Sequence, residues 1–281
     1  MNIYLISLFF LNYISGNTVM KKIYLISILS LLIISCGVKD GLVTEYYENG
    51  NVKYEGSFKS GKPEGVHNEY YKTGQLYLMN NFKGGERNGV SKEYYENGQL
   101  FIESNHKNDQ FHGSEKNWYE NGQIKFEDEY MNGILDGVRK NWYENSQLSL
   151  EVLYKDGMKN GKRLSYYENG QLRGEEYFNN DQQDGESLYW YENGNMFIKS
   201  NYIDGVLNGE VTNWYENGLV KRKDNYKDGK REGEMIGYTD TGKIVLSGNY
   251  INDKKEGKWN YYNQDGSIDE VEQYKNGELI E

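Results

Sequence analysis

Few residues of this 281-residue chain have the type and spacing that catalysis or metal binding requires. The three histidines, His67, His106 and His112, are too few and too scattered to suggest a metal cluster. The chain contains a 24-residue repeat, described below, and His106 stands at a position that is aromatic in the other copies. We therefore interpret it as a packing residue. His112 precedes a loop glycine, which favours a solvated loop residue. An active site breaks the symmetry of a repeat, and the sequence gives no sign of such a group.

Carboxylates are abundant, but many recur in one short phrase and therefore share the same surroundings: Glu48, Glu96, Glu120, Glu144, Glu168, Glu192 and Glu216. Acid–base catalysis by paired carboxylates needs contrasting environments. The glycine-rich segment "KDGKREG" (Lys227–Gly233) lacks the strand–loop–helix context of a phosphate-binding loop. We therefore expect no enzyme activity, no cofactor and no metal site. Weak calcium binding at the acidic turns is a less favoured alternative.

The only cysteine, Cys36, follows a segment with the features of a bacterial export signal. From Met20 the chain reads "MKKIYLISILSLLIISCG", in which two lysines precede the apolar run Ile23–Ile34. The last residues before the glycine, "IISC", resemble a lipobox, although Ile34 is bulkier than the usual small residue. This resemblance implies lipid attachment at Cys36 and a membrane-anchored lipoprotein of the cell envelope, at the outer membrane or the cell surface. A plain buried or membrane-anchoring segment with an incidental cysteine is the alternative.

Residues 1–35 are thus interpreted as a leader segment and residues 36–281 as the repeat array. Residues 1–19 contain a second copy of "IYLIS" but no basic residue, so we expect translation to begin at Met20. Neither apolar run reaches the roughly 18–20 residues of a membrane-spanning helix. We therefore expect no permanent transmembrane helix. A single cysteine also excludes a disulfide within the chain.

The charge of the chain limits its partners. The formal net charge is −11, and without the two leader lysines 30 basic and 43 acidic residues give −13. Such an acidic surface repels nucleic acid and anionic lipid headgroups, so we expect no nucleic acid partner. Aromatic residues make up 15% of the chain, which is too many for a disordered protein.

The dominant feature is an internal repeat of 24 residues without insertion or deletion. The residue that closes the phrase "YYENG" is glycine in all copies but one: Gly50, Gly74, Gly98, Gly122, Ser146, Gly170, Gly194, Gly218, Gly242 and Gly266. A second glycine column lies nine residues upstream, from Gly41 to Gly257. A third, which contains some aspartates, lies four residues before that, from Gly37 to Gly277.

Aromatic and aliphatic columns follow the same period. The first aromatic column contains Tyr46, Tyr70, Tyr94, Trp118, Trp142, Tyr166, Trp190, Trp214, Tyr238 and Tyr262. The next residue is tyrosine in eight copies and is replaced by Thr239 and Asn263 in the last two. The residue two after the turn glycine is always aliphatic, and the residue eight after it is aromatic or histidine.

These columns predict β-hairpins. Asn-Gly between two runs of aromatic and β-branched residues is typical of a two-residue type I′ turn. A turn at Asn97-Gly98 would pair Tyr95 with Leu100 and place both on one face with His106. Tyr94 would then lie on the opposite face, beside Phe101. The third glycine column would form a looser return to the next hairpin.

One hairpin of 24 residues cannot bury a core, so neighbouring hairpins must stack. At about 10 Å per hairpin, ten units form a sheet on the order of 100 Å long. The unit, as in "YYENGQL" at Tyr94–Leu100, resembles the variant MORN repeat of bacterial proteins often labelled YwqK-type antitoxins. The resemblance implies an all-β fold: an elongated single-layer antiparallel sheet of about ten stacked hairpins. We expect helix only in the amino-terminal leader.

The same resemblance implies a non-catalytic scaffold for protein or membrane association, and we expect a protein partner. The alternative is an antitoxin that neutralises a toxin by direct binding, although export would separate it from a cytosolic toxin. Tyrosine and tryptophan provide large contact area with a polar group, so a peptide or a glycan is also compatible. The candidate ligand-facing aromatic stripe is Tyr46, Tyr70, Tyr94, Trp118, Trp142, Tyr166, Trp190 and Trp214.

Overall fold

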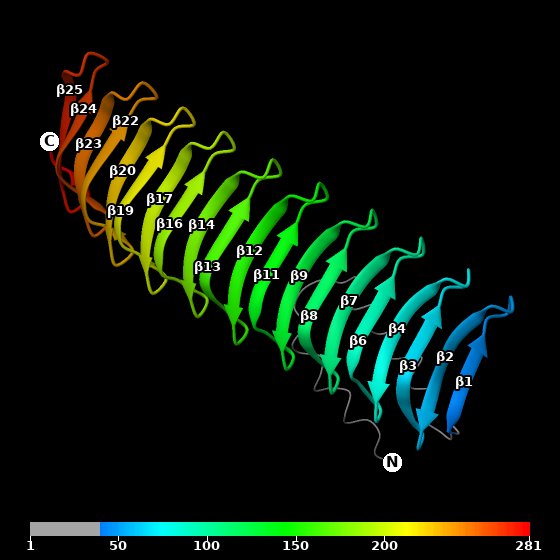
Figure 1. Cartoon of the computed structure of the whole chain (residues 1–281). Helices are drawn as coiled ribbons and strands as arrows, with labels where there is room; N and C mark the ends of the chain where they lie inside the picture. Colours follow the sequence, from blue (N-terminus) through cyan, green and yellow to red (C-terminus); the bar gives the residue numbers. More distant parts are fainter. Residues whose placement is uncertain (1–39) are drawn as a thin grey trace.

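The computed structural model describes residues 40–281 and shows one open antiparallel sheet of 26 strands. The sheet is a single elongated layer in which the hairpins follow one another in chain order (Figure 1). Residues 40–281 contain strands and turns but no helix. The predicted all-β sheet of stacked hairpins is therefore confirmed, whereas the predicted helical leader lies outside the described residues.

Twenty strands have six or more residues: β1 (Gly41–Tyr46), β2 (Val52–Lys59), β3 (Lys62–Tyr70), β4 (Leu76–Lys83), β6 (Gly89–Tyr94), β7 (Leu100–Lys107), β8 (Gln110–Trp118), β9 (Ile124–Met131), β11 (Gly137–Trp142), β12 (Leu148–Lys155), β13 (Met158–Tyr166), β14 (Leu172–Asn179), β16 (Gly185–Trp190), β17 (Met196–Ile203), β19 (Gly209–Trp214), β20 (Val220–Lys227), β22 (Gly233–Tyr238), β23 (Ile244–Ile251), β24 (Lys254–Tyr262) and β25 (Ile268–Lys275). Six strands have two residues: β5 (Glu86–Arg87), β10 (Ile134–Leu135), β15 (Gln182–Gln183), β18 (Val206–Leu207), β21 (Lys230–Arg231) and β26 (Glu278–Leu279).

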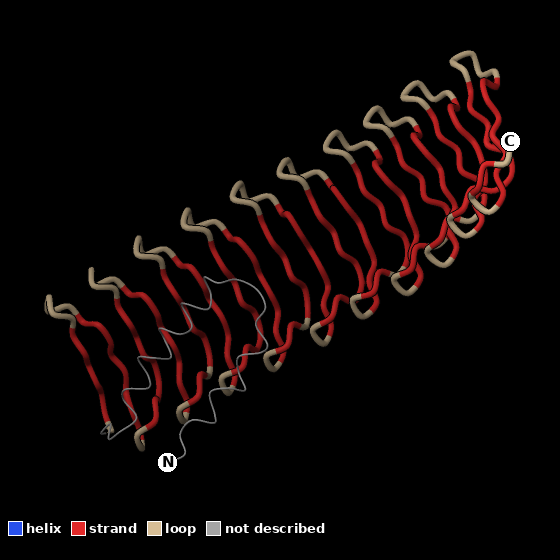
Figure 2. Tube along the Cα trace, turned by 180° about the vertical axis from the view of Figure 1, so that it is seen from behind, coloured by secondary structure: helices blue, strands red, loops and turns tan. Residues whose placement is uncertain are grey.

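Turns lie along both long edges of the sheet (Figure 2). At the edge that carries the "YENG" phrase, the Gly98 N–H donates to the Tyr95 carbonyl (2.9 Å) and the Tyr95 N–H donates to the Gln99 carbonyl (2.8 Å). Within this turn, only Gly98 has a positive φ, of 87°. This is a type I turn followed by a left-handed residue that forms a bulge. The predicted type I′ turn at Asn97-Gly98 is therefore wrong.

The pairing around that turn also differs from the prediction. Leu100 lies opposite Tyr94 and not opposite Tyr95. Phe101 packs against Tyr95, with 4.7 Å between the ring centroids, whereas we expected it beside Tyr94. The cause is the longer loop, because the extra turn residue moves the register by one position.

The type I′ turns occur at the opposite edge. Asn108 and Asp109 both have positive φ, 52° and 65°, and directly join the paired residues Lys107 and Gln110. The other hairpins turn in the same way, for example at Asp156 and Gly157. The third glycine column therefore forms the tight turn that we expected at Asn-Gly, and it is not a loose return.

The second glycine column marks a bulge in every unit after the first. Between β2 and β3, Gly56 lies opposite His67 and Ser57 lies opposite Glu64, so Gly65 and Val66 are extra on one strand. Gly65 has a φ of 78°, a backbone conformation that residues with a Cβ rarely adopt. Bulges bend strands, and the strands are visibly bowed along their length (Figure 1).

The buried side chains lie almost entirely on one face, which we call the inner face. Because alternate residues of a strand point to opposite faces, the strand register shows on which face each buried residue lies. Of the buried residues, only Thr212 lies on the opposite face, which we call the outer face. No second layer covers either face within residues 40–281, so the crowding of bowed strands produces this burial. The inner-face buried residues are Phe58, His67, Ser91, Ser104, His106, Asn117, Asp128, Val152, Glu176, Ser187, Ser200, Val211, Asp224, Met235, Tyr250 and Trp259.

Candidate functional site

The second tyrosine of the turn phrase connects each unit to the next. The Tyr143 hydroxyl donates to the Tyr166 carbonyl at 2.8 Å, across a sequence separation of 23 residues. The same bond, at 2.6–2.9 Å, is made by all eight tyrosines of this column: Tyr47, Tyr71, Tyr95, Tyr119, Tyr143, Tyr167, Tyr191 and Tyr215. The acceptor is always the backbone of a first-column residue. The column is therefore a structural device that fixes adjacent turns.

The aromatic stripe ends the first strand of each hairpin on the outer face. Tyr70 shows this orientation, because its hydroxyl donates to the outer-face residue Glu55 at 2.5 Å. Tyr262, in the same column, hydrogen-bonds Ser247 at 3.1 Å in the same way. The stripe residues of units 2–8 are half-buried, whereas Tyr46 of the first unit is 63% exposed. The fold thus brings the eight residues into one row, one hairpin apart.

Cross-strand ion pairs accompany the stripe on the outer face. Lys92 Nζ lies 2.9 Å from Glu103, and Lys116 Nζ lies 3.0 Å from Glu127. These side chains are about one-third exposed. Exposed pairs contribute about 0–1 kcal/mol each to stability, so their main effect is to keep the outer face polar around the aromatic rings.

The inner face carries a row of charged groups that the repeat pattern does not reveal. Arg139 binds Asp128 through two hydrogen bonds, of 2.7 and 2.6 Å. Asp128 is 2% exposed, and its neighbour across the strands is Glu115. Burial, and then the nearby Asp128 carboxylate, raises the pKa of Glu115 to about 7, although Tyr130 and Arg139 act in the opposite direction.

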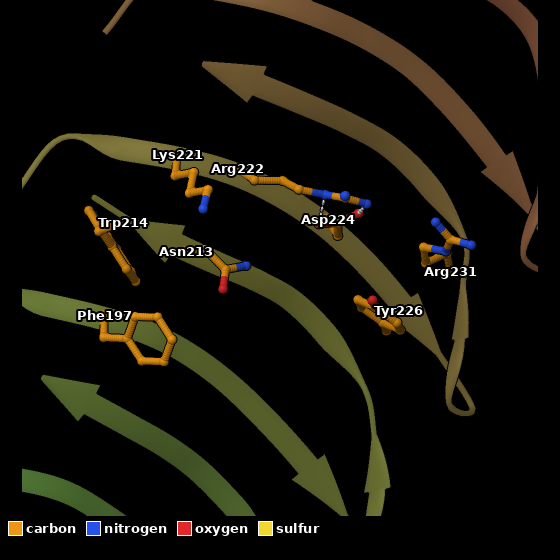
Figure 3. A pocket seen from close by; sticks show the side chains of 8 residues that line it. All are labelled: Phe197, Asn213, Trp214, Lys221, Arg222, Asp224, Tyr226 and Arg231. Atoms are coloured by element: carbon orange, nitrogen blue, oxygen red, sulfur yellow. Dashed lines mark hydrogen bonds and ion pairs between the residues drawn. The ribbon is translucent and has the colours of Figure 1, made fainter. Parts of the chain in front are cut away.

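A second charged region borders an open depression of about 490 Å³, which is lined mainly by inner-face residues but also by the stripe residue Trp214 (Figure 3). Arg222 donates two hydrogen bonds to Asp224, at 2.6 and 2.5 Å. The Arg231 guanidinium lies 4.0 Å from the centre of the Tyr250 ring and 3.2 Å from Asp253. The lining residues are Phe197, Asn213, Trp214, Lys221, Arg222, Asp224, Tyr226 and Arg231.

The depression is suited to contact and charge recognition. Its lining combines aromatic rings with three cationic side chains and one carboxylate. None of the lining residues is a cysteine, serine or histidine. Its two arginines are already held by Asp224 and by Asp253.

The residues singled out in the sequence have different outcomes. Cys36 lies outside the described residues. His106 is 5% exposed and packs on Phe111 at 4.8 Å between centroids, as expected of a packing residue. Burial lowers the pKa of His106 to about 4. His67 is also a core residue, since it bonds Tyr54 at 2.6 Å and the Ser57 carbonyl at 2.8 Å.

Within residues 40–281, neither a group of metal ligands nor a membrane-spanning helix is present. No three His, Cys, Asp or Glu side chains are grouped closely enough to hold a metal ion within that part of the chain. The same residues include no helix with the length and apolar character needed to cross a membrane.

Comparison with protein families identifies the repeat. The description "MORN repeat variant" fits eight segments that together cover more than half of the chain: residues 39–60, 87–108, 111–132, 135–156, 159–180, 183–204, 207–228 and 231–252. The chain belongs to the MORN repeat variant family. The family is generally non-catalytic and commonly mediates protein or membrane interactions. Residues 61–86 and 253–281 are unmatched, yet they continue the same sheet of this MORN repeat protein.

Curated proteins and solved structures give no further information on the role of this chain. Among curated proteins, no match to this chain was found. Two crystal structures are similar over most of the chain: TcdB2-TccC3-Cdc42, with 13% identity and a TM-score of 0.21 over 79% of this chain, and TcdB2-TccC3, with 11% identity and a TM-score of 0.16 over 85%. The similarity spans only 14% and 18% of those chains.

Proposed function

We propose that this protein is a non-catalytic scaffold of the bacterial cell envelope, anchored by lipid on Cys36, that binds a protein partner through the aromatic stripe. Membership of the MORN repeat variant family supports the scaffold role. The observation that carries the proposal is the row of eight aromatic side chains at one strand position of successive hairpins, on a face that no second layer covers within residues 40–281.

The chemistry of the stripe favours a protein partner. Tryptophan and tyrosine dominate the energetics of protein interfaces, because they supply large apolar area together with a polar group. Around them, Lys–Glu pairs such as Lys116 and Glu127 would form the polar rim that interfaces usually have. The inner face fits this role less well, since the two arginines that border its depression are already paired with Asp224 and Asp253.

A comparison of two variants of the tagged full chain tests the binding role. In the first, Trp118, Trp142 and Trp190 are replaced by serine. In the matched control, the outer-face lysines Lys92, Lys116 and Lys140 are replaced by serine. We expect one partner protein to co-purify with the wild type and the lysine variant and to be lost from the tryptophan variant. Equal recovery from both variants would refute the stripe as the binding surface.

The anchor is tested separately by labelling growing cells with a fatty-acid analogue. We expect label on the wild-type chain and none on the Cys36→Ala variant; an unlabelled wild type would contradict the anchor. No observation within residues 40–281 favours the antitoxin alternative. Recovery of a cytosolic toxin as the only partner would nevertheless replace the scaffold proposal with that alternative.

A further inference from the structure

The two ends of the open sheet differ in the strand edge that they present. β1 pairs with β2 on one side and with no strand of residues 40–281 on the other. In later units the equivalent strand has two neighbours; β6, for example, pairs with β7 and also with β4. β1 therefore has backbone groups that are ready to accept another strand.

On the same side, the side chains of β1 also have no neighbouring strand within residues 40–281. Leu42 is 71% exposed and Tyr46 is 63% exposed, the two highest values among the large hydrophobic residues of the described chain. The nine later members of the Tyr46 column are half-buried. Leu42, Thr44 and Tyr46 alternate along β1 and therefore lie on the same outer face. The edge is thus an apolar strand whose missing neighbour would cover both exposed residues.

The opposite end of the sheet carries repulsive charge. Within residues 268–281 the acidic residues are Asp269, Glu270, Glu272, Glu278 and Glu281. Head-to-tail stacking in the register of the array would repeat the pairing of Leu78 with Glu93, which places Glu270 opposite Glu45 of the next copy. Like charges directly opposite each other destabilise a sheet. The last two units also lack the turn tyrosine that donates to a following unit.

We propose that β1 pairs antiparallel with β1 of a second copy of this chain, about a two-fold axis at Thr44. In this register Leu42 lies opposite Tyr46 of the second copy, and the symmetry repeats that contact. Val43 lies opposite Glu45, so the two copies of Glu45 do not face each other. Each Glu45 keeps its pairing with Lys53, at 3.5 Å. Such an isologous contact closes at two copies and does not extend into a fibre.

A single introduced thiol distinguishes this arrangement from head-to-tail stacking. The full chain with Cys36→Ser and Thr44→Cys is oxidised, and the products are separated without reductant. We expect a disulfide-linked dimer, because residues on the axis of an antiparallel pair lie about 4.5–5.5 Å apart at Cα. The matched variant Val271→Cys should stay monomeric. The double variant should give only dimers, whereas head-to-tail stacking would pair position 44 with position 271 and give a ladder of oligomers.

The mass of the complex in solution provides an independent test. Light scattering of the wild-type full chain is measured at concentrations on the order of 0.1 mM, because a six-residue edge buries less than a standard interface. We expect Leu42→Lys with Tyr46→Lys to raise the Kd of the dimer by at least about tenfold. The control Leu279→Lys with Ile280→Lys, at the other end of the sheet, should leave the Kd unchanged. A monomeric wild type, or equal weakening by both pairs of changes, would refute the proposal.

Discussion

The turn phrase has two neighbouring aromatic residues with opposite roles. The hydroxyls of Tyr143 and its equivalents donate a hydrogen bond to the next unit. These side chains therefore serve the cohesion of the sheet itself. The residue before each of them, such as Trp142, contributes its carbonyl to the same kind of bond and leaves its side chain on the outer face. The backbone of each stripe residue in units 2–8 is therefore fixed by the preceding unit, which keeps the row of aromatic side chains in register.

The first prediction concerns this hydroxyl. Tyr143→Phe removes the bond to the Tyr166 carbonyl and keeps the ring. We expect the free energy of unfolding to fall by about 1 kcal/mol, the usual contribution of one hydrogen bond. Urea unfolding measures the change. The matched control is Tyr154→Phe, whose hydroxyl has no hydrogen bond within residues 40–281. An equal loss from both variants would mean that the inter-unit bond contributes no stability of its own.

The second prediction concerns Glu115, whose pKa burial and Asp128 raise from 4.5 to about 7. Since the folded-state value exceeds the unfolded value, ionised Glu115 destabilises the fold. This cost is absent below about pH 4.5 and complete above about pH 7. Glu115→Gln should therefore stabilise the protein by on the order of 2 kcal/mol more at about pH 8 than at about pH 4.5. The measurement is urea unfolding at both pH values, and an identical gain at both would contradict the burial argument.

At the scale of the element, each hairpin uses two kinds of turn that the sequence does not separate. Asn-Gly favours a type I′ turn in general. Here, however, the Asn97 side chain accepts a hydrogen bond from the Gln99 N–H at 2.9 Å, and only Gly98 takes a left-handed conformation. The resulting longer loop lets Tyr95 reach the Trp118 carbonyl at 2.8 Å. The requirement to join neighbouring units therefore decides the turn type.

The third prediction follows from the one copy that lacks the turn glycine. Ser146 has a φ of 69°, and a residue with a Cβ pays about 1 kcal/mol for a left-handed conformation. Ser146→Gly should therefore raise the free energy of unfolding by about 1 kcal/mol. The matched control is Gly194→Ser, where an added Cβ meets nothing within 4 Å, so the expected loss is due to the backbone alone. Thermal or urea unfolding that shows no change in either variant would contradict this reading of the turn.

The regular columns explain how much of the fold could be predicted. Period, hairpins and the single sheet follow from residues that repeat, such as Gly98 and Tyr95. The charged inner face could not be predicted in this way, because the residue types at its positions vary from unit to unit. One such column contains Ser91, Glu115, Arg139, Val211 and Trp259. Without a repeated type these residues give no pattern. They become neighbours only when the hairpins stack, so the ion pair of Asp128 with Arg139 was missed.

For the whole molecule, the sheet is a long support with a different role for each face. The inner face carries nearly all of the buried side chains of residues 40–281 and supplies stability. The outer face carries the stripe among surface ion pairs, and the β1 edge offers a contact for a second copy. This division is what the scaffold proposal requires, because the stripe can then contact a partner without any change in the fold.

Site-specific photocross-linking tests the central claim most directly. A photoreactive phenylalanine analogue replaces Trp142 or Trp190 in the stripe. In the control it replaces Tyr154 on the inner face. Each variant of the full chain is expressed in the cells that normally produce the protein. We expect both stripe positions to cross-link to the same second protein and position 154 to give no cross-link. Cross-links of equal strength from position 154, or none from either stripe position, would contradict this expectation.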